Sequence, residues 1–146
     1  MRRIGLLLCA FMLAAVSAHA QMTSFNDYCS GIAPKASVGK DISSATDTQF
    51  IAPIANASIY VCDANVNQAG GTGTVYLESA TAASCGGTLA QLSGKFTANT
   101  TAGTTTDFHL NPGMAGTVLV VPAGDGLCVK STGTIVQSIT VDYVQR

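Results

Sequence analysis

Apolar and polar residues alternate along this chain in short runs, which is the pattern of β-strands with one buried face. The clearest run lies at 139–145, where Ile139, Val141 and Tyr143 share one face. Gly, Asn, Asp and Pro separate the runs, and no segment after residue 20 has the 3.6-residue apolar period of a helix. We therefore predict an all-β chain. The expected strands are 48–54, 58–66, 73–79, 92–98, 106–110, 117–121, 127–130 and 139–145.

The segments between these runs predict how the strands are connected. The glycine-rich GGTG (70–73) separates strands 58–66 and 73–79, which predicts a hairpin. The stretch ANTTAGTTT (98–106) is expected to be an exposed loop. The unbroken apolar run TVLVV (117–121) is typical of a strand buried on both faces. Seven or eight short strands at this spacing predict a single antiparallel β-sandwich or jelly-roll-like domain.

The first twenty residues have the three-part pattern of a signal peptide. MRRIGLLLCAFMLAAVSAHA begins with two arginines, continues with an apolar run and ends with small residues, which predicts cleavage after Ala20. The apolar run (4–16) is shorter than the roughly 20 residues that span a bilayer, so we do not expect the leader to be a transmembrane helix. We expect no membrane span in the chain that remains after cleavage. The predicted organisation is a signal peptide at 1–20, an N-terminal arm at 21–35 and a β-sandwich domain at 36–146. The protein is then exported and is periplasmic, on the cell surface or extracellular.

Charge argues against two classes of partner. Cleavage after Ala20 would leave five basic residues against eight acidic ones, with no basic run among them. Binding to nucleic acid or to an anionic membrane surface needs a concentrated positive patch. We therefore expect neither partner. The five basic residues are Lys35, Lys40, Lys95, Lys130 and Arg146.

The cysteines beyond the leader number four, which predicts two disulfides in an exported protein. They are Cys29, Cys62, Cys85 and Cys128, and no two are close enough in sequence to resemble a zinc-binding pair, so no metal or other cofactor is expected. Strand alternation points Cys62 and Cys128 away from their apolar neighbours. A hairpin at 58–79 would return Cys85 to Cys62, which favours Cys62–Cys85 and Cys29–Cys128. A Cys62–Cys128 bridge is the alternative.

Few residues suggest catalysis. His109 is the one histidine after the leader, and it lies beside Asp107 on the polar face of its strand. Glu78 is the only glutamate, and local sequence marks out no pair of carboxylates of the kind that glycoside hydrolysis needs, although distant acids could converge in space. We predict a protein that is not an enzyme and has no catalytic residues. A small hydrolase using His109 and Asp107 is the last alternative.

Six stretches, taken in order, resemble small β-sandwich proteins of tailed bacteriophages and prophages that are thought to be virion-surface or decoration components. The resemblance covers roughly 29–145 and implies a sandwich fold without catalytic residues. Virion proteins of this kind usually lack a leader, so the predicted signal peptide points to an exported bacterial relative. The stretches are SIYVCD (58–63), GTVYLES (73–79), LSGKF (92–96), DFHLNPG (107–113), VVPAGDGLCVK (120–130) and ITVDYVQ (139–145).

These observations predict a secreted, non-enzymatic structural or adhesive surface module that forms part of an oligomer, fibre or particle. Sandwich domains have edge strands that can pair with another chain, so self-association or contact with a surface or its glycans is the expected interaction. The alternative function is a soluble carbohydrate- or ligand-binding module. Its binding surface would be formed by Tyr60, Tyr76 and Tyr143.

Overall fold

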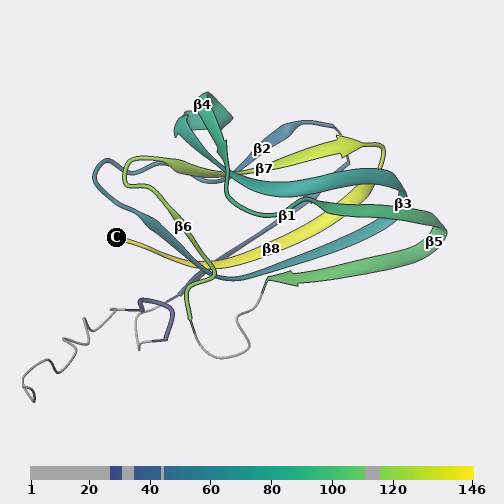
Figure 1. The fold of residues 1–146 in the computed structure, drawn as a ribbon, viewed down its shortest axis with the longest axis horizontal. Helices are drawn as coiled ribbons and strands as arrows, with labels where there is room; N and C mark the ends of the chain where they lie inside the picture. Colours follow the sequence, from purple (N-terminus) through teal and green to yellow (C-terminus); the bar gives the residue numbers. More distant parts are fainter. Residues whose placement is uncertain (1–26, 31–34, 44, 111–115) are drawn as a thin grey trace, which may run out of the picture.

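The described residues of this computed structural model, 27–30, 35–43, 45–110 and 116–146, form eight β-strands and one turn of 3₁₀ helix (Figure 1). For 99–103 only the backbone is described. The all-β prediction is confirmed. The predicted signal peptide (1–20) and its cleavage site after Ala20 lie outside the described residues, as does most of the arm at 21–35. The elements are β1 Ala36–Ile42, β2 Asp47–Ile51, β3 Ile59–Ala82, η1 Ala83–Cys85, β4 Gly86–Gln91, β5 Phe96–Leu110, β6 Leu119–Val121, β7 Gly126–Gly133 and β8 Val136–Gln145.

All eight strands belong to one antiparallel sheet, and the sheet is folded over to make the two layers of a sandwich. β3 runs through both layers: its first part pairs with β8 and its second part pairs with β7. β5 follows β3 around the same bend, at the right of Figure 1. The first layer contains β1, β8, 59–69 of β3, 105–110 of β5, and β6. The second layer contains β2, β7, 73–82 of β3, 96–100 of β5, and β4.

Two glycines facing each other allow the sheet to fold. Gly73 of β3 is paired with Gly133 of β7, at the point where both strands leave the second layer. A Cβ atom on Gly73 would clash with the backbone oxygen of Thr132, and one on Gly133 would clash with that of Thr72. Gly133 also has a φ of 85°, a left-handed conformation that favours glycine. Only two residues without side chains let the backbones approach this closely.

The hydrophobic core lies between the two layers. On β3 the inward side chains alternate, with Ile59 and Val61 in the first layer and Val75 and Leu77 in the second, each at most 2% exposed. Partners from both layers complete one continuous cluster, so the layers stabilise each other. The shared face predicted for 139–145 is confirmed, because Ile139 and Val141 are buried and Tyr143 packs against this core. The other buried members are Ile42, Phe50, Ile51, Ala64, Val66, Val121, Leu127 and Val129.

Three of the predicted strand assignments are wrong. The segments 58–66 and 73–79 are not a hairpin but parts of the single 24-residue strand β3, and GGTG lies at its bend. The predicted loop at 98–106 is likewise part of β5, a 15-residue strand. The run 117–121 is not buried on both faces: β6 is a three-residue strand that pairs, among the described residues, only with β3, and Val120 is 50% exposed. Thus β3 and β5 are longer than the glycine and threonine pattern predicted, because that pattern divided each of them.

The disulfides join Cys29 to Cys62 and Cys85 to Cys128, with Cα–Cα separations of 5.2 Å and 5.9 Å. Both the predicted pairing of Cys62–Cys85 with Cys29–Cys128 and the alternative Cys62–Cys128 bridge are therefore wrong. The prediction relied on a hairpin, whereas the continuous β3 places Cys62 near its start and Cys85 just beyond its end. The predicted orientation is confirmed, because Cys62 and Cys128 pack in small clusters separate from the main core.

Candidate functional site

The two residues proposed for catalysis, Asp107 and His109, lie on an exposed face of the first layer. The ring Nε2 of His109 is 3.1 Å from Nδ2 of Asn65, and Nδ2 of Asn67 donates a hydrogen bond to Asp107. Each residue is thus bonded to an asparagine directly opposite it on β3. Both side chains are exposed, so His109 lacks the buried and oriented environment that a catalytic triad gives its imidazole.

The same rows of side chains continue across β8. Asn65 lies opposite Thr140, and Asn67 lies opposite Ser138. Both β8 residues are exposed, and the two asparagines are half-buried. The result is an open surface of amide, hydroxyl, carboxylate and imidazole groups on the outside of the first layer. We call it the polar face: Asn65, Asn67, Asp107, His109, Ser138 and Thr140.

The three tyrosines proposed as a stacking surface do not come together. Tyr60 packs on Tyr28, with ring centroids 4.4 Å apart, in the cluster around the Cys29–Cys62 disulfide. Tyr143 packs against the main core. Tyr76 lies in the second layer, where the Lys95 ammonium is 5.5 Å from its ring centre. Each ring serves a separate local contact, so the structure does not bring them together as a single platform.

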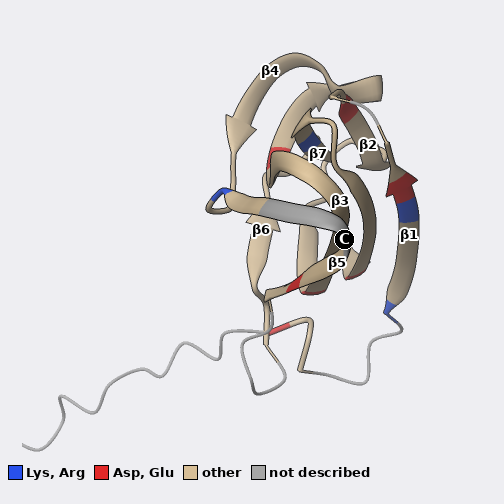
Figure 2. Cartoon of the chain, turned by 90° about the vertical axis from the view of Figure 1, so that its right-hand side faces the viewer, with Lys and Arg blue, Asp and Glu red and all other residues tan. Residues whose placement is uncertain are grey.

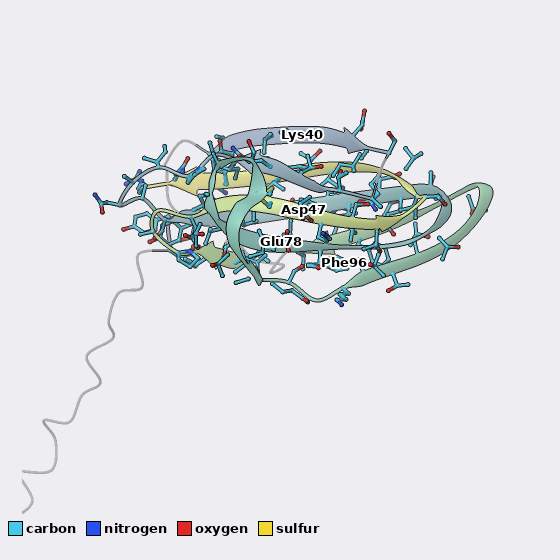
Figure 3. The ribbon with its side chains drawn as sticks, turned by 90° about the horizontal axis from the view of Figure 1, so that it is seen from above. Lys40, Asp47, Glu78 and Phe96 are labelled. Atoms are coloured by element: carbon cyan, nitrogen blue, oxygen red, sulfur yellow. A yellow bond between two sulfur atoms is a disulfide. The ribbon has the colours of Figure 1, made fainter. Side chains whose placement is uncertain are left out.

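Two carboxyl groups distant in sequence do converge in the second layer. Glu78 of β3 is 4% exposed, and it lies near Asp47 at the start of β2 (Figure 3). Lys130 of β7 forms an ion pair with Asp47, with Nζ 2.7 Å from Oδ1. The register explains the meeting, because Asp47 is opposite Lys130 and Lys130 is opposite Tyr76, two residues from Glu78.

The turn η1 lies on the outer face of the second layer near Glu78, because Cys128, the residue opposite Glu78, is disulfide-bonded to Cys85 of η1. η1 contacts β2, β3 and β7, and the Cys85–Cys128 disulfide fixes it to β7. Gln49 of β2 accepts a hydrogen bond from the backbone N–H of Ser84 in η1. Ala80, Cys85 and Cys128 form a small buried cluster beneath the turn. The outer face of the second layer thus has a cover of its own, unlike the polar face.

Burial and the neighbouring acid both raise the pKa of Glu78, burial being the larger cause, while Lys130 opposes them. The hydrogen bond to Asp47 raises the pKa of Lys130. The raised pKa of Glu78 is thus explained by its burial in the sheet beside Asp47.

Asp27, which sequence reasoning did not single out, anchors the N-terminal segment. Its Oδ1 accepts hydrogen bonds from Oγ1 of Thr117 at 2.8 Å and from the backbone N–H of Cys29 at 3.0 Å. The bond from Thr117 is the largest of the causes that lower the pKa of Asp27. Arg146 lies over the Tyr28 ring, 5.3 Å from its centre. We call this group the N-terminal clasp: Asp27, Tyr28, Cys29, Tyr60, Cys62, Thr117 and Arg146.

Two further observations concern metal ligands and membrane spans. Within the described residues, no three His, Cys, Asp or Glu side chains are grouped so that they could hold a metal ion. No helix in that part of the chain has the length and apolar character needed to cross a membrane. Asp125 lies in a turn, with its N–H bonded to the carbonyl of Pro122, and Asp63 lies on strand β3.

Comparison with protein-family models, curated proteins and solved structures found no match to this chain.

Proposed function

We propose that this protein is an exported, non-enzymatic structural or adhesive module that acts as a subunit of a larger assembly. One observation carries this proposal: on the side of the sheet occupied by β5, both outer strands expose a large apolar side chain. Leu89 on β4 is 38% exposed and Val120 on β6 is 50% exposed. Exposed apolar groups on strand edges are typical of surfaces that pair with another chain.

The ionisable groups and the disulfides support the same proposal. Lys130 forms an ion pair with Asp47 beside the buried Glu78, and His109 is bonded to an asparagine, so each of these side chains has a partner or a packed position within the sheet. Two disulfides indicate an oxidising environment, and the predicted leader gives the route to one. A domain cross-linked by two disulfides is suited to a structural role outside the cytoplasm.

The test is assembly of the mature, oxidised chain. We expect the protein to be recovered from its host with envelope, fibres or particles, with its first residue near Gln21 by mass spectrometry. The purified chain should form oligomers in sedimentation velocity as its concentration is raised. A chain that stays monomeric at high concentration and is found only as a free soluble species would contradict the proposal.

A soluble glycan-binding module is the second candidate, and the polar face is the observation that favours it. The face offers amide, hydroxyl and carboxylate groups on neighbouring strands, which suit hydrogen bonding to sugar hydroxyls. It presents no aromatic ring for stacking among the residues that define it. A glycan array should then give binding that Asn65→Ala weakens and Tyr76→Ala does not. Absence of binding on the array would remove this candidate.

A further inference from the structure

Most of the free edges of the sheet are protected. At one side, β1 carries Lys40 and Asp41, and the Lys40 ammonium donates a hydrogen bond to the backbone oxygen of Gln49 on the neighbouring edge strand β2. At the other side, β5 carries Asp107 and His109, and β6 is only three residues long. Charged side chains and short strands are the usual means by which proteins prevent unwanted strand pairing.

β4 has neither kind of protection. It is six residues long, its sequence GGTLAQ has no charge and no proline, and five of its six residues are exposed. Figure 2 shows β4 without any charged residue at the outside of the fold, whereas β1 shows both signs of charge. Within the described residues β4 pairs only with β3.

The backbone of β4 presents hydrogen-bonding groups outward. The N–H of Thr88 is bonded to Oγ1 of Thr81 on β3, and the N–H of Leu92 is bonded to the carbonyl of Leu77, so the even-numbered residues point toward β3. Along a strand these groups alternate in direction. The N–H and C=O of Leu89 and Gln91 therefore point away from β3. They form a row on which another strand can pair.

We infer that β4 is a self-association edge, which pairs antiparallel with β4 of a second copy of this chain across a two-fold axis. The inference rests on the proposed function, because it names the surface through which the module would assemble. The second copy is the favoured occupant because β4 has no charge to repel its own duplicate, and an antiparallel two-fold contact brings each strand against itself.

The outward groups set the register of this pairing. When the N–H and C=O of both Leu89 and Gln91 bond to the second copy, Leu89 lies opposite Gln91 of that copy and Gln91 lies opposite its Leu89. Each of these two residue pairs forms two backbone hydrogen bonds, which makes four in all. Ala90 then lies opposite Ala90 of the second copy as a non-hydrogen-bonded pair, in which Cα atoms are about 4.5 Å apart. The exposed Leu89 side chains would be covered, and the second layers of the two molecules would become one continuous sheet.

The first experiment is sedimentation equilibrium of the full oxidised chain and two charge variants. Leu89→Lys should weaken dimerisation at least about tenfold, because it brings like charges into the new contact. Val120→Lys is the matched control on β6, and it should change the dissociation constant less than about twofold. Equal effects of the two variants would overturn the inference, as would no effect of either.

The second experiment tests the register without weakening the contact. Ala90→Cys should form an intermolecular disulfide under mild oxidation, because the expected Cα separation is within disulfide range. Thr88→Cys is the control: it lies two residues from the axis, so its duplicate is too distant to bridge. Peptide mapping would identify the bond. Cross-linking of both variants alike, or of neither, would overturn the inference even if Leu89→Lys fails to fold.

The two proposals can fail separately. A wild-type chain that assembles while Leu89→Lys assembles equally well and Ala90→Cys does not cross-link would overturn the β4 edge but leave the structural function standing. A wild-type chain that never assembles would contradict both.

Discussion

The outer faces of the two layers differ in what lies over them. The polar face of the first layer is open, and its asparagines and hydroxyls meet solvent. The outer face of the second layer is covered by η1, which encloses Ala80 and the Cys85–Cys128 bridge and lies beside the nearly buried Glu78. One face is therefore available for contact, whereas the other has become a small second core. The comparison shows that the buried acid of this fold lies where the sheet surface is covered.

A substitution at the bend that creates the two layers should have the largest effect on the free energy of unfolding. Gly73→Val should lower the free energy of unfolding by more than about 4 kcal/mol, because its side chain would clash with the Thr132 backbone. Chemical denaturation measures the change. Gly94→Val is the control, since no atom outside its neighbours lies within 4 Å of a Cβ atom there. A stable Gly73→Val variant would mean that the sheet does not fold at this glycine pair.

Removing the cover of the second layer comes next. The double variant Cys85→Ala/Cys128→Ala should lose about 4 kcal/mol, from the chain entropy of its 43-residue separation. Cys29→Ala/Cys62→Ala, with a separation of 33, should lose nearly the same amount. The two double variants should differ in a second measurement, the pKa of Glu78. Only loss of the Cys85–Cys128 bridge should bring the pKa of Glu78, followed by carboxyl NMR, down toward its ordinary value of 4.5, because burial is the main cause of its increase. Equal shifts in both variants would contradict the covering role of η1.

The raised pKa of Glu78 should have a smaller effect on stability, and this effect depends on pH. Its raised pKa means that the folded state holds a proton that the unfolded state has released, so stability falls as pH rises above about 4.5 toward the raised value. Glu78→Gln cannot ionise and should lack this decline, which gives it a relative gain at neutral pH. Asp47→Asn is a useful comparison, because it removes the neighbouring charge but also breaks the ion pair with Lys130. Identical pH profiles for wild type and Glu78→Gln would show that Glu78 titrates normally.

The open face should be the least sensitive to change. His109→Ala should alter the free energy of unfolding by less than about 0.5 kcal/mol, because the side chain is exposed and its contact with Asn65 can be replaced by water. Thermal denaturation checks this value. A loss comparable with that of the disulfide variants would show that the polar face contributes to the fold and is not merely available for contact.

Local patterns in the sequence predicted some of these features well. Alternation correctly placed Ile139 and Val141 in the core and turned Cys62 and Cys128 away from it. Alternation is a property of each strand alone, so it is readable without knowing the partners. The predicted cysteine pairs were wrong for the opposite reason, since pairing depends on how the strands are connected.

Glycine and threonine caused most of the errors. Gly70 and Gly71 indicate a turn by composition, yet β3 continues through them and only bends. The meeting of Asp47 with Glu78 requires β2, β7 and β3 to be neighbours, which neither residue signals in its own surroundings. Asp27 is similar, because its partner Thr117 is 90 residues away. Long-range pairing of this kind is set by the tertiary fold and cannot be inferred from local sequence.

The pairing of the first described strand with the last has a consequence for biosynthesis. Ala36 of β1 lies opposite Tyr143 of β8, and β8 is also the neighbour of 59–69 of β3 on the side away from β5 and β6. A folding chain must close that whole loop before either pairing forms, which favours slow folding. Translation adds only about 5–20 residues per second, so the early strands wait until residues 136–145 have been made. The first layer can therefore be completed only after its last strand has been synthesised, so β1 remains without its partner for most of the time that translation of the domain takes.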